Sequence, residues 1–570
     1  MPSQVQRDTE SERSAAVDAE RDRHHERFRP RPAALALAVI AVVGVAAGWW
    51  HFWFLTDDAF ISFRYMSNAM LGRGLVWNPP PFSPVEGYTS WLWTVSLLQL
   101  WRATGIEPPV AANWISLIFG YATLFVVYCF VRRMAFPPTL ARHRLAFLAL
   151  VFLGTLTNRT FLTWLSSGLE TSLFNFCFAL WIYHALQPIG ARRGQVFWIS
   201  LAATLAALTR PDGLLLAAAT PALFAIDALE RPAPLSQLLR RFAWAFPGLG
   251  LLLHLGWRRS IYGEWLPNTY YAKYASPWPE SGLRYAASFV LEYALWIWLG
   301  LALFWLVRHG RARGGTSARA LVVAAAVGAH LAYYTFAIGG DHFEYRVYSH
   351  LVPLVFVSFA WLIARLELRP ALAFSLFGVF ILASAPLPWV HHLTTSISGR
   401  GLKTVTPVAP RFPPGLRWYA RQFDELQAWL IHRSVAVRQE EHAAFHRWLE
   451  EFLPPRAEGA AIDWDDRPVT AAGSVGVLGW RLPHVAIIDR LGLNDYQIAR
   501  APRPPRRGPR QMAHERRPPE GYVECFRPNV VIAPRDGEGE PKNQIVVEPR
   551  RRPLTDAEIT RCEWDFRVAD

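Results

Sequence analysis

Hydrophobic residues recur in long runs from Ala33 to about Val390, and the chain beyond is polar and rich in proline and arginine. The stretch Ala33–Leu55 has no Asp, Glu, Lys or Arg and is long enough to cross a bilayer as one helix. The pattern predicts an all-α polytopic membrane domain with about eleven spanning helices. Their approximate centres are Val43, Leu124, Val151, Cys177, Ala203, Ala217, Leu251, Ile297, Ala326, Phe356 and Phe377.

The turns between these runs are basic on alternate sides of the predicted membrane. Short cytoplasmic loops are enriched in Lys and Arg, which sets the orientation of the chain. With a cytoplasmic N-terminus, every predicted cytoplasmic turn is basic, and the residues are Arg132, Arg133, Arg142, Arg144, Arg192, Arg193, Arg231, Arg240, Arg241, Arg308, Arg311, Arg313, Arg365 and Arg369. This orientation requires Trp91–Trp101 to lie on the outer surface as an interfacial helix.

The first run is preceded by Arg21–Arg31, which is rich in Arg and His. A signal peptide would have a shorter charged region than this one, so we interpret the run as an uncleaved first helix. We expect residues 1–32 to be a disordered cytoplasmic segment. A membrane domain over 33–390 and an extracytoplasmic C-terminal domain over 391–570 should follow.

The polar C-terminal region has its own element pattern. Apolar residues on one face predict a helix over Glu440–Phe452, and alternation predicts strands within Val469–Ile488 and near Val530–Ile532 and Ile545–Val547. These elements predict a small α/β domain. Cys525 and Cys562 both fall in it and are candidates for a disulfide, because an extracytoplasmic compartment is oxidising.

The composition fits a membrane part averaged with a polar part. Hydrophobic residues make up 52% and charged residues 18% of the 570 residues, and the mean hydropathy is +0.13. A net charge of +14 would suit nucleic acid, but the arginines lie in short loops and in the tail, without a nucleic-acid-binding motif. We interpret them as orientation signals and contacts with membrane lipids.

Two adjacent carboxylates, Asp57 and Asp58, stand where the first span ends on the predicted outer face. Ionisable residues at a membrane boundary are costly and are by default a functional hypothesis. The alternative is that they only stabilise the start of the helix predicted over Ala59–Leu71, since Asp favours helix N-termini.

The other predicted outer turns collect more acids, cations and aromatics. Those of interest are Arg64, Glu86, Tyr88, Glu170, Arg210, Asp212, Asn268, Lys273, Asp341, His342, Glu344 and Arg346. A carboxylate can remove a proton from a sugar hydroxyl, and Arg or Lys can stabilise a phosphate leaving group. A sugar carried on polyprenyl phosphate needs both at the edge of a bilayer. A site on the outer face would use such a lipid-carried donor, because nucleotide sugars are cytoplasmic.

Several sequence blocks resemble those of integral-membrane glycosyltransferases of the GT-C type. The blocks are DDAFISFRY, GLVWNP, VEGYTSWLW, SGLET, TRPDG, LPNTYYAK and GGDHFEYR. They are most similar to the bacterial arabinofuranosyltransferase B group, which transfers arabinofuranose from decaprenyl-phosphate arabinose onto cell-wall arabinan. The resemblance implies a multi-pass enzyme of the inner membrane with a GT-C membrane module and an extracytoplasmic C-terminal domain.

The resemblance also implies roles for single residues. Asp57 or Asp58 is the expected general base, with Asp57 slightly favoured. The expected phosphate contacts are Arg64, Lys273, His342 and Arg346. The remaining substrate-binding candidates are Glu86, Tyr88, Glu170, Arg210, Asp212, Asn268 and Asp341.

Plainer interpretations stay open for several of these residues. Arg210 and Asp212 serve equally well to cap a helix end, and Lys273 to reach lipid headgroups. The Asp341–Glu344 turn has the residue types of a metal site but favours a hydrogen-bond network. A divalent cation is compatible with an acidic pair and a phosphate, but no ligand set is assigned to one.

The sequence therefore predicts transfer of a sugar, arabinofuranose by resemblance, from a polyprenyl-phosphate donor to a cell-envelope glycan on the outer face of the membrane. Two alternatives remain. One is a related transferase for another sugar or acceptor. The other is a non-catalytic protein that binds or transports lipid-linked sugars, although the interiors of the predicted spans are nearly free of ionisable residues.

Overall fold

The computed structural model describes residues 32–188, 193–273, 276–309, 317–398, 404–505, 508–513, 515–535 and 543–567. The predicted cytoplasmic segment 1–32 lies outside these ranges except for its last residue, as do Arg192, Arg311 and Arg313.

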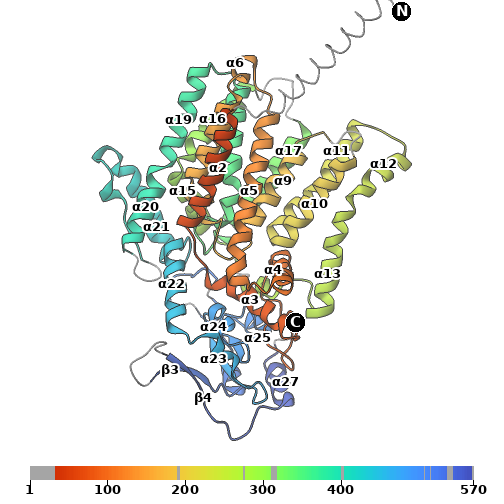
Figure 1. The fold of residues 1–570 in the computed structure, drawn as a ribbon, viewed down its shortest axis with the longest axis vertical. Helices are drawn as coiled ribbons and strands as arrows, with labels where there is room; N and C mark the ends of the chain where they lie inside the picture. Colours follow the sequence, from red (N-terminus) through yellow and green to blue (C-terminus); the bar gives the residue numbers. More distant parts are fainter. Residues whose placement is uncertain are drawn as a thin grey trace, which may run out of the picture.

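Long helices run side by side through the larger part of the molecule (Figure 1). They are α2 (Pro32–His51), α5 (Pro108–Arg133), α7 (Arg144–Thr157), α9 (Thr171–Ala185), α10 (Arg193–Thr209), α11 (Leu214–Glu230), α13 (Leu249–Tyr262), α15 (Pro279–Glu292), α16 (Leu295–His309), α17 (Ala318–Ala332), α18 (Val352–Arg365), α19 (Pro370–Ser384) and α20 (Pro386–Ser398). Shorter elements connect them: α6 (Pro138–Ala141), α8 (Arg159–Thr163), η1 (Pro211–Gly213), α12 (Leu235–Phe242), η2 (Ala243–Gly248), α14 (Asn268–Lys273), η3 (Tyr333–Ile338) and η4 (Arg346–Leu351).

Six helical segments of the described chain are long and apolar enough to cross a membrane, or seven if a sharply bent pair counts as one span. The six are Pro32–His51, Pro108–Arg133, Pro211–Glu230, Ala318–Ile338, Arg346–Arg365 and Pro370–Ser396, and the bent pair is Pro279–Glu292 with Leu295–Arg308. All eleven predicted centres fall within helices, but the remaining helices are shorter than a full span. The predicted number of spans is therefore not confirmed, whereas a multi-pass helical membrane protein is.

The sequence explains where the first long helices begin and end. Helix α5 begins with a Pro–Pro pair. Proline suits the first turn of a helix, because it has no backbone N–H and the N–H groups of that turn have no partner within the helix. It ends with Arg132 and Arg133, whose charge suits the negative end of a helix dipole. The first outer loop forms α3 (Asp57–Met70) and α4 (Trp91–Thr104), so helices stand where 59–71 and 91–101 predict them.

The C-terminal region contains short helices and two small sheets. The helices are η5 (Ala409–Arg411), η6 (Pro414–Leu416), α21 (Arg417–Ile431), α22 (Gln439–Phe452), α23 (Arg456–Ala460), α24 (Gly476–Arg481), α25 (Tyr496–Arg500), α26 (Tyr522–Cys525) and α27 (Asp556–Asp565). Strand β1 (Val469–Ala472) pairs in parallel with β2 (Ala486–Asp489), and β3 (Val530–Pro534) pairs antiparallel with β4 (Asn543–Val547). The predicted helix and strands are present, and a disulfide joins Cys525 to Cys562.

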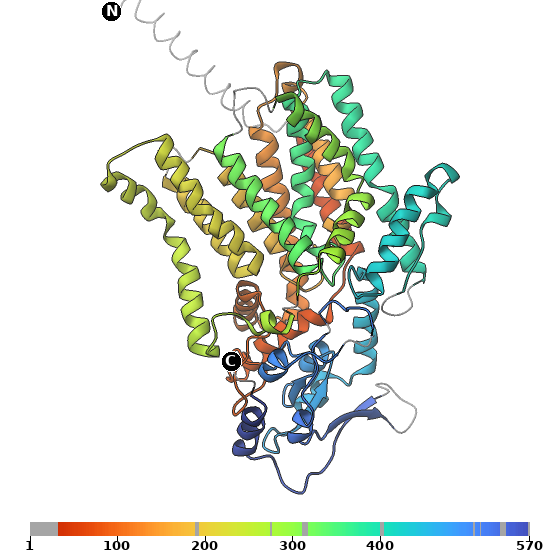
Figure 2. The same cartoon turned by 180° about the vertical axis from the view of Figure 1, so that it is seen from behind.

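From α22 onward this region lies at one end of the helix bundle, together with α3 and α4, whereas α21 lies along the side of the bundle and α6 and the α11–α12 connection lie at the other end (Figures 1 and 2). Its core is continuous with that of the bundle: Val477, Trp480 and Ile487 belong to the same buried cluster as Phe63 and Trp77. The C-terminal region therefore packs onto the first outer loop, and the domain boundary at 391 remains a prediction.

The disulfide gives a direct test of this region. The chain has four cysteines, and Cys129 and Cys177 are free thiols. Denatured protein from an oxidising preparation should take up two maleimide labels, and four after reduction, as counted by mass spectrometry. Four labels without reduction would show that Cys525 and Cys562 are not joined.

Candidate active site

The first outer loop is anchored so that the acidic pair begins helix α3. The Thr56 side chain accepts a hydrogen bond from the Ala59 amide and caps the helix. The Thr56 amide donates to the Ser167 carbonyl at 3.1 Å. Gly168 has φ +77°, and a Cβ there would come within 2.8 Å of Ala59, so only glycine fits. The second outer turn thus fixes the start of α3.

The two aspartates differ in their contacts. The Asp57 carboxylate accepts hydrogen bonds from the amides of Val477 at 2.7 Å and Gly476 at 3.3 Å. Burial raises the pKa of Asp57 to about 6, and these two amide bonds oppose the rise. No described residue makes a hydrogen bond or ion pair with the half-buried Asp58 carboxylate.

Asp58 belongs to a mixed-charge group with residues of two other outer turns. Burial lowers the pKa of His342, the carboxylates of Asp58 and Asp341 raise it, and the ammonium of Lys273 lowers it further. These charges are therefore close enough to influence one another. Lys273 is exposed at the end of α14, and Arg346 forms an ion pair with Asp341 at 3.1 Å. The fifth outer turn thus carries its own ion pair, and the charges of Asp58 and Lys273 both act on the His342 imidazole.

A second polar group lies at the outer end of α10. Arg210 pairs with Glu170 at 3.1 Å and with Asp212 at 2.9 Å, and the Tyr334 hydroxyl donates to Asp212 at 2.8 Å. The side chains of Arg210 and Glu170 are each only 8% exposed. This group joins the second and third outer turns to η3 and is internally satisfied, which agrees with the structural interpretation of Arg210 and Asp212.

Other candidates from the sequence act as internal ties. The Arg64 guanidinium donates to the carbonyls of Trp77, Gly479, Leu482 and Val485 at 2.7–2.9 Å and to Asn78 Oδ1 at 3.3 Å. It is 1% exposed. All its donors point at protein acceptors, so in this structure Arg64 is not placed to contact a phosphate.

Glu86, Tyr88 and Asn268 are likewise turned inward. Glu86 forms a buried ion pair with Arg258 at 2.5 Å, and burial raises its pKa to about 7. The hydroxyls of Tyr88 and Tyr262 lie 3.2 Å apart. The Asn268 amide donates to carbonyls of the C-terminal region. These residues link the first and fourth outer turns to that region, and no contact of theirs points to a substrate.

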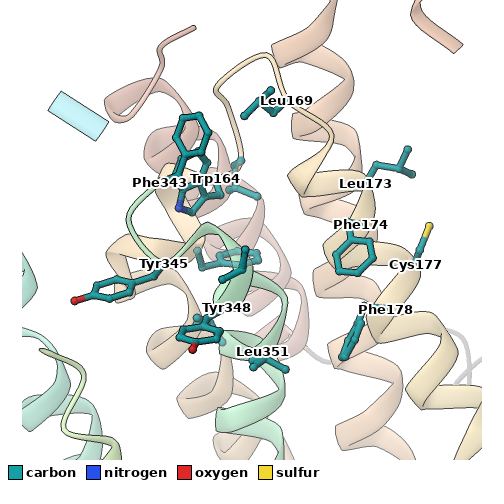
Figure 3. Packing of buried hydrophobic residues seen from close by; sticks show 14 of the residues in the cluster. Trp164, Leu169, Leu173, Phe174, Cys177, Phe178, Phe343, Tyr345, Tyr348 and Leu351 are labelled. Carbon is teal, nitrogen blue, oxygen red and sulfur yellow. The ribbon is translucent and has the colours of Figure 1, made fainter. Parts of the chain in front are cut away.

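Aromatic side chains pack within and against the fifth outer turn, residues 339–346. Trp164 donates from its indole to the Glu344 carbonyl at 2.9 Å and meets Phe343 edge to face, with ring centroids 5.6 Å apart. Figure 3 shows Trp164 and Phe343 together, with Tyr345 and Tyr348 following along the same segment. This packing fixes the backbone that carries Asp341 and His342.

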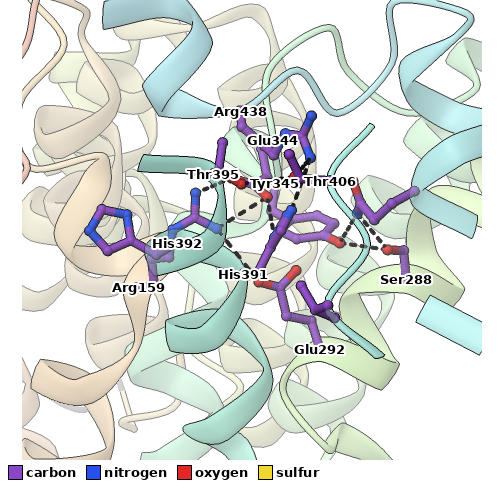
Figure 4. A network of polar contacts seen from close by, with 12 residues as sticks. Arg159, Ser288, Glu292, Glu344, Tyr345, His391, His392, Thr395, Thr406 and Arg438 are labelled. Atoms are coloured by element: carbon purple, nitrogen blue, oxygen red, sulfur yellow. Dashed lines mark hydrogen bonds and ion pairs between the residues drawn. The ribbon is translucent and has the colours of Figure 1, made fainter. Parts of the chain in front are cut away.

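Sequence reasoning missed a buried ionic network centred on Arg159 (Figure 4). Arg159 is 2.7 Å from Glu344, 3.1 Å from Glu440 and 3.7 Å from Glu292. Burial lowers the pKa of Arg159, but these carboxylates outweigh burial and raise it overall. Glu440 comes from α22, so the network joins the C-terminal region to the bundle. Its members are scattered in sequence, and only the tertiary fold brings them together.

The residues Asp341, His342 and Glu344 do not converge on a metal position. Asp341 pairs with Arg346, His342 Nδ1 contacts the Ser434 carbonyl at 2.8 Å, and Glu344 pairs with Arg159.

A different set in the described chain has its ligand atoms within 4.8 Å of one another: Glu292, Glu344 and His391. There, Arg438 lies 3.1 Å from His391 Nε2. A guanidinium can only donate, so Nε2 accepts and the ring proton sits on Nδ1, facing the carboxylates. We therefore interpret this set as part of the ionic network.

Over 295 residues the chain is 26% identical to the terminal β-(1→2)-arabinofuranosyltransferase of Mycobacterium tuberculosis, covering 46% of this chain and 42% of that protein. The chain is similar to an arabinofuranosyltransferase. This similarity confirms the resemblance drawn from the sequence blocks, although the aligned part spans less than half of either protein. No family model matches the chain.

Solved structures with a similar overall arrangement include ArnT from Cupriavidus metallidurans. Its apo form has a TM-score of 0.47 at 14% identity, over 81% of this chain and 88% of that chain. Its form bound to undecaprenyl phosphate has a TM-score of 0.45 at 12% identity, over 80% and 85%. The arabinosyltransferase EmbB from Mycobacterium smegmatis has a TM-score of 0.39 at 12% identity, over 74% and 42%.

The internal role of Arg64 predicts a loss of stability from the conservative change Arg64→Lys. A lysine cannot reproduce the planar fork of donors, so several buried carbonyls would lose their partners at about 1–3 kcal/mol each. We expect the Tm of the purified protein in detergent to fall by about 3 °C or more. Arg552→Lys, at an exposed pair with Glu558, is the control and should leave the Tm unchanged. Equal Tm values for the two variants would contradict this role.

Proposed function

We propose that this protein is a GT-C-type glycosyltransferase that moves a sugar, arabinofuranose, from a polyprenyl-phosphate donor to a cell-envelope glycan acceptor. The observation that carries the proposal is the acidic pair at the start of α3, whose Asp58 carboxylate acts on the His342 imidazole together with the Lys273 ammonium, at the end of a membrane helix bundle. The similarity to an arabinofuranosyltransferase supports the sugar. An inner-membrane location with this end outward agrees with the basic turns of the sequence.

The chemistry follows from the charges. The acceptor hydroxyl loses its proton to the Asp57 carboxylate, and its oxygen forms a bond with the anomeric carbon of the donor sugar. The bond between that carbon and the phosphate oxygen breaks, and polyprenyl phosphate leaves with the electron pair. Lys273 stabilises the charge on the leaving phosphate, as does His342 once it is protonated at Nε2, because its Nδ1 proton already goes to the Ser434 carbonyl.

Asp57 is the better base of the two. A base works best when its pKa approaches the working pH, and burial brings the pKa of Asp57 to about 6. Its amide bonds orient the carboxylate while each oxygen keeps acceptor capacity. Asp58, whose charge acts on His342, is then suited to hold the acceptor or the donor sugar.

The decisive test is sugar transfer by the purified protein from a panel of synthetic polyprenyl-phosphate sugars. The wild type should transfer arabinofuranose, and Asp57→Asn should lower kcat by about a hundredfold or more, because general-base catalysis contributes that much. Asp58→Asn should act mainly on KM. Glu280→Gln, in an exposed pair with Arg284, is the matched carboxamide control and should behave as wild type.

Other outcomes would change the proposal in different ways. Transfer of another sugar would keep the mechanism and discard arabinofuranose. Full activity of Asp57→Asn with loss in Asp58→Asn would exchange the two roles. Donor binding without transfer to any acceptor by the wild type would replace the enzyme with a binding or transport protein.

A further inference from the structure

Helix α24 of the C-terminal region lies directly against α3 of the first outer loop (Figure 1). Its first two amides, those of Gly476 and Val477, bind the Asp57 carboxylate. Carbonyls at and beyond its other end, those of Gly479, Leu482 and Val485, bind Arg64. An acid thus faces the positive end of α24 and a cation faces its negative end, which is the favourable arrangement for a helix dipole.

The approach of the two helices leaves no room for a side chain at the contact. A Cβ at Gly476 would lie 1.8 Å from the Asp57 carbonyl oxygen and 2.8 Å from its carboxylate. A Cβ at Gly479 would lie 2.8 Å from the Arg64 side chain. In the same segment, Gly473 has nothing within 4 Å of the corresponding position. The close approach is therefore confined to the residues that touch α3.

The C-terminal region also holds the two other outer turns of the candidate site. The Val437 amide donates to the His342 carbonyl at 2.8 Å, and the Ala436 amide donates to the Asp341 carbonyl at 3.0 Å. Arg500 donates to Asn268 Oδ1 at 2.9 Å, on the short helix that ends at Lys273. The backbone of each of the three charged turns is thus fixed by the same region.

We propose that the C-terminal region is part of the active centre, and that Gly476 and Val477 are positioning residues whose amides hold the catalytic Asp57 carboxylate in place. This inference rests on the proposed transferase function and deepens it. No atom of Gly476 or Val477 needs to touch the substrate, because both act through Asp57.

The hydrogen bonds from Gly476 and Val477 also affect the pKa of Asp57, which a purely structural contact would not do. The two amides stabilise the ionised form of Asp57, whose pKa is raised by burial and by the neighbouring Asp58 and Asp489 carboxylates. Losing one amide weakens the opposition to those effects, so the pKa of Asp57 rises further. A base must be ionised to act, so activity would then be lost first on the acid side of the pH profile.

The test is the pH dependence of kcat/KM for Gly476→Ala in the full-length protein, with Gly473→Ala as the matched control. The wild type and Gly473→Ala should share an acid limb near the Asp57 pKa of about 6. In Gly476→Ala the limb should move up by about one unit, with about a fivefold loss near pH 6 that approaches tenfold at lower pH. The reduction should fall on kcat more than on the donor KM.

A second variant covers the case in which Gly476→Ala does not fold. Val477→Pro removes the N–H that makes the 2.7 Å bond to Asp57. It costs no intrahelical bond, because the amides of a first helical turn have no partner within the helix. A monodisperse Val477→Pro protein should show the same upward shift of the acid limb.

The possible outcomes separate the two proposals. A folded variant that loses activity equally at every pH, or that matches Gly473→Ala, would overturn the positioning role while an inactive Asp57→Asn still supports the transferase. A wild type that transfers no sugar would instead overturn the proposed function.

Discussion

The docking of α24 on α3 is the contact on which the candidate site depends. Asp57 and Arg64 lie two turns apart on one helix, and both are bound by backbone groups of α24 and the residues just after it, more than 400 residues away in sequence. Without that backbone, a carboxylate and a guanidinium would be left buried and unpaired, which is costly. The first outer loop and the C-terminal region therefore form one structural unit.

The Arg159 network also joins the C-terminal region to the rest of the molecule, through other elements than the first outer loop. It connects α8, α15, the fifth outer turn and α22 through buried charges, and Arg438 extends it to His391. Removing one partner of a buried ionic group usually destabilises more than the group as a whole stabilises, because a charge is left uncompensated. Such a network fixes the fifth outer turn, which carries His342, against α8, α15 and α22.

Much of this structure follows from patterns that the sequence displays. Apolar runs predict the positions of the long helices, and alternation predicts β1 to β4, because both depend on local periodicity. Contacts between distant segments do not have such a signal. Arg64 appears in the sequence as a cation near an acidic pair, and only the fold shows that its donors point at backbone carbonyls. The closely approached Gly476 and the distant Gly473 also look alike in the sequence.

The central claim is that Asp57, held by the C-terminal region, faces a donor phosphate bound by Lys273 and His342. A cryo-EM structure of the protein with a non-reactive polyprenyl-phosphonate arabinofuranose analogue tests it most directly. The phosphonate should contact Lys273 and His342, with the anomeric carbon toward the acidic pair and the Gly476 and Val477 amides still on Asp57. An analogue bound elsewhere, or an Asp57 released from α24 when the analogue binds, would contradict the account.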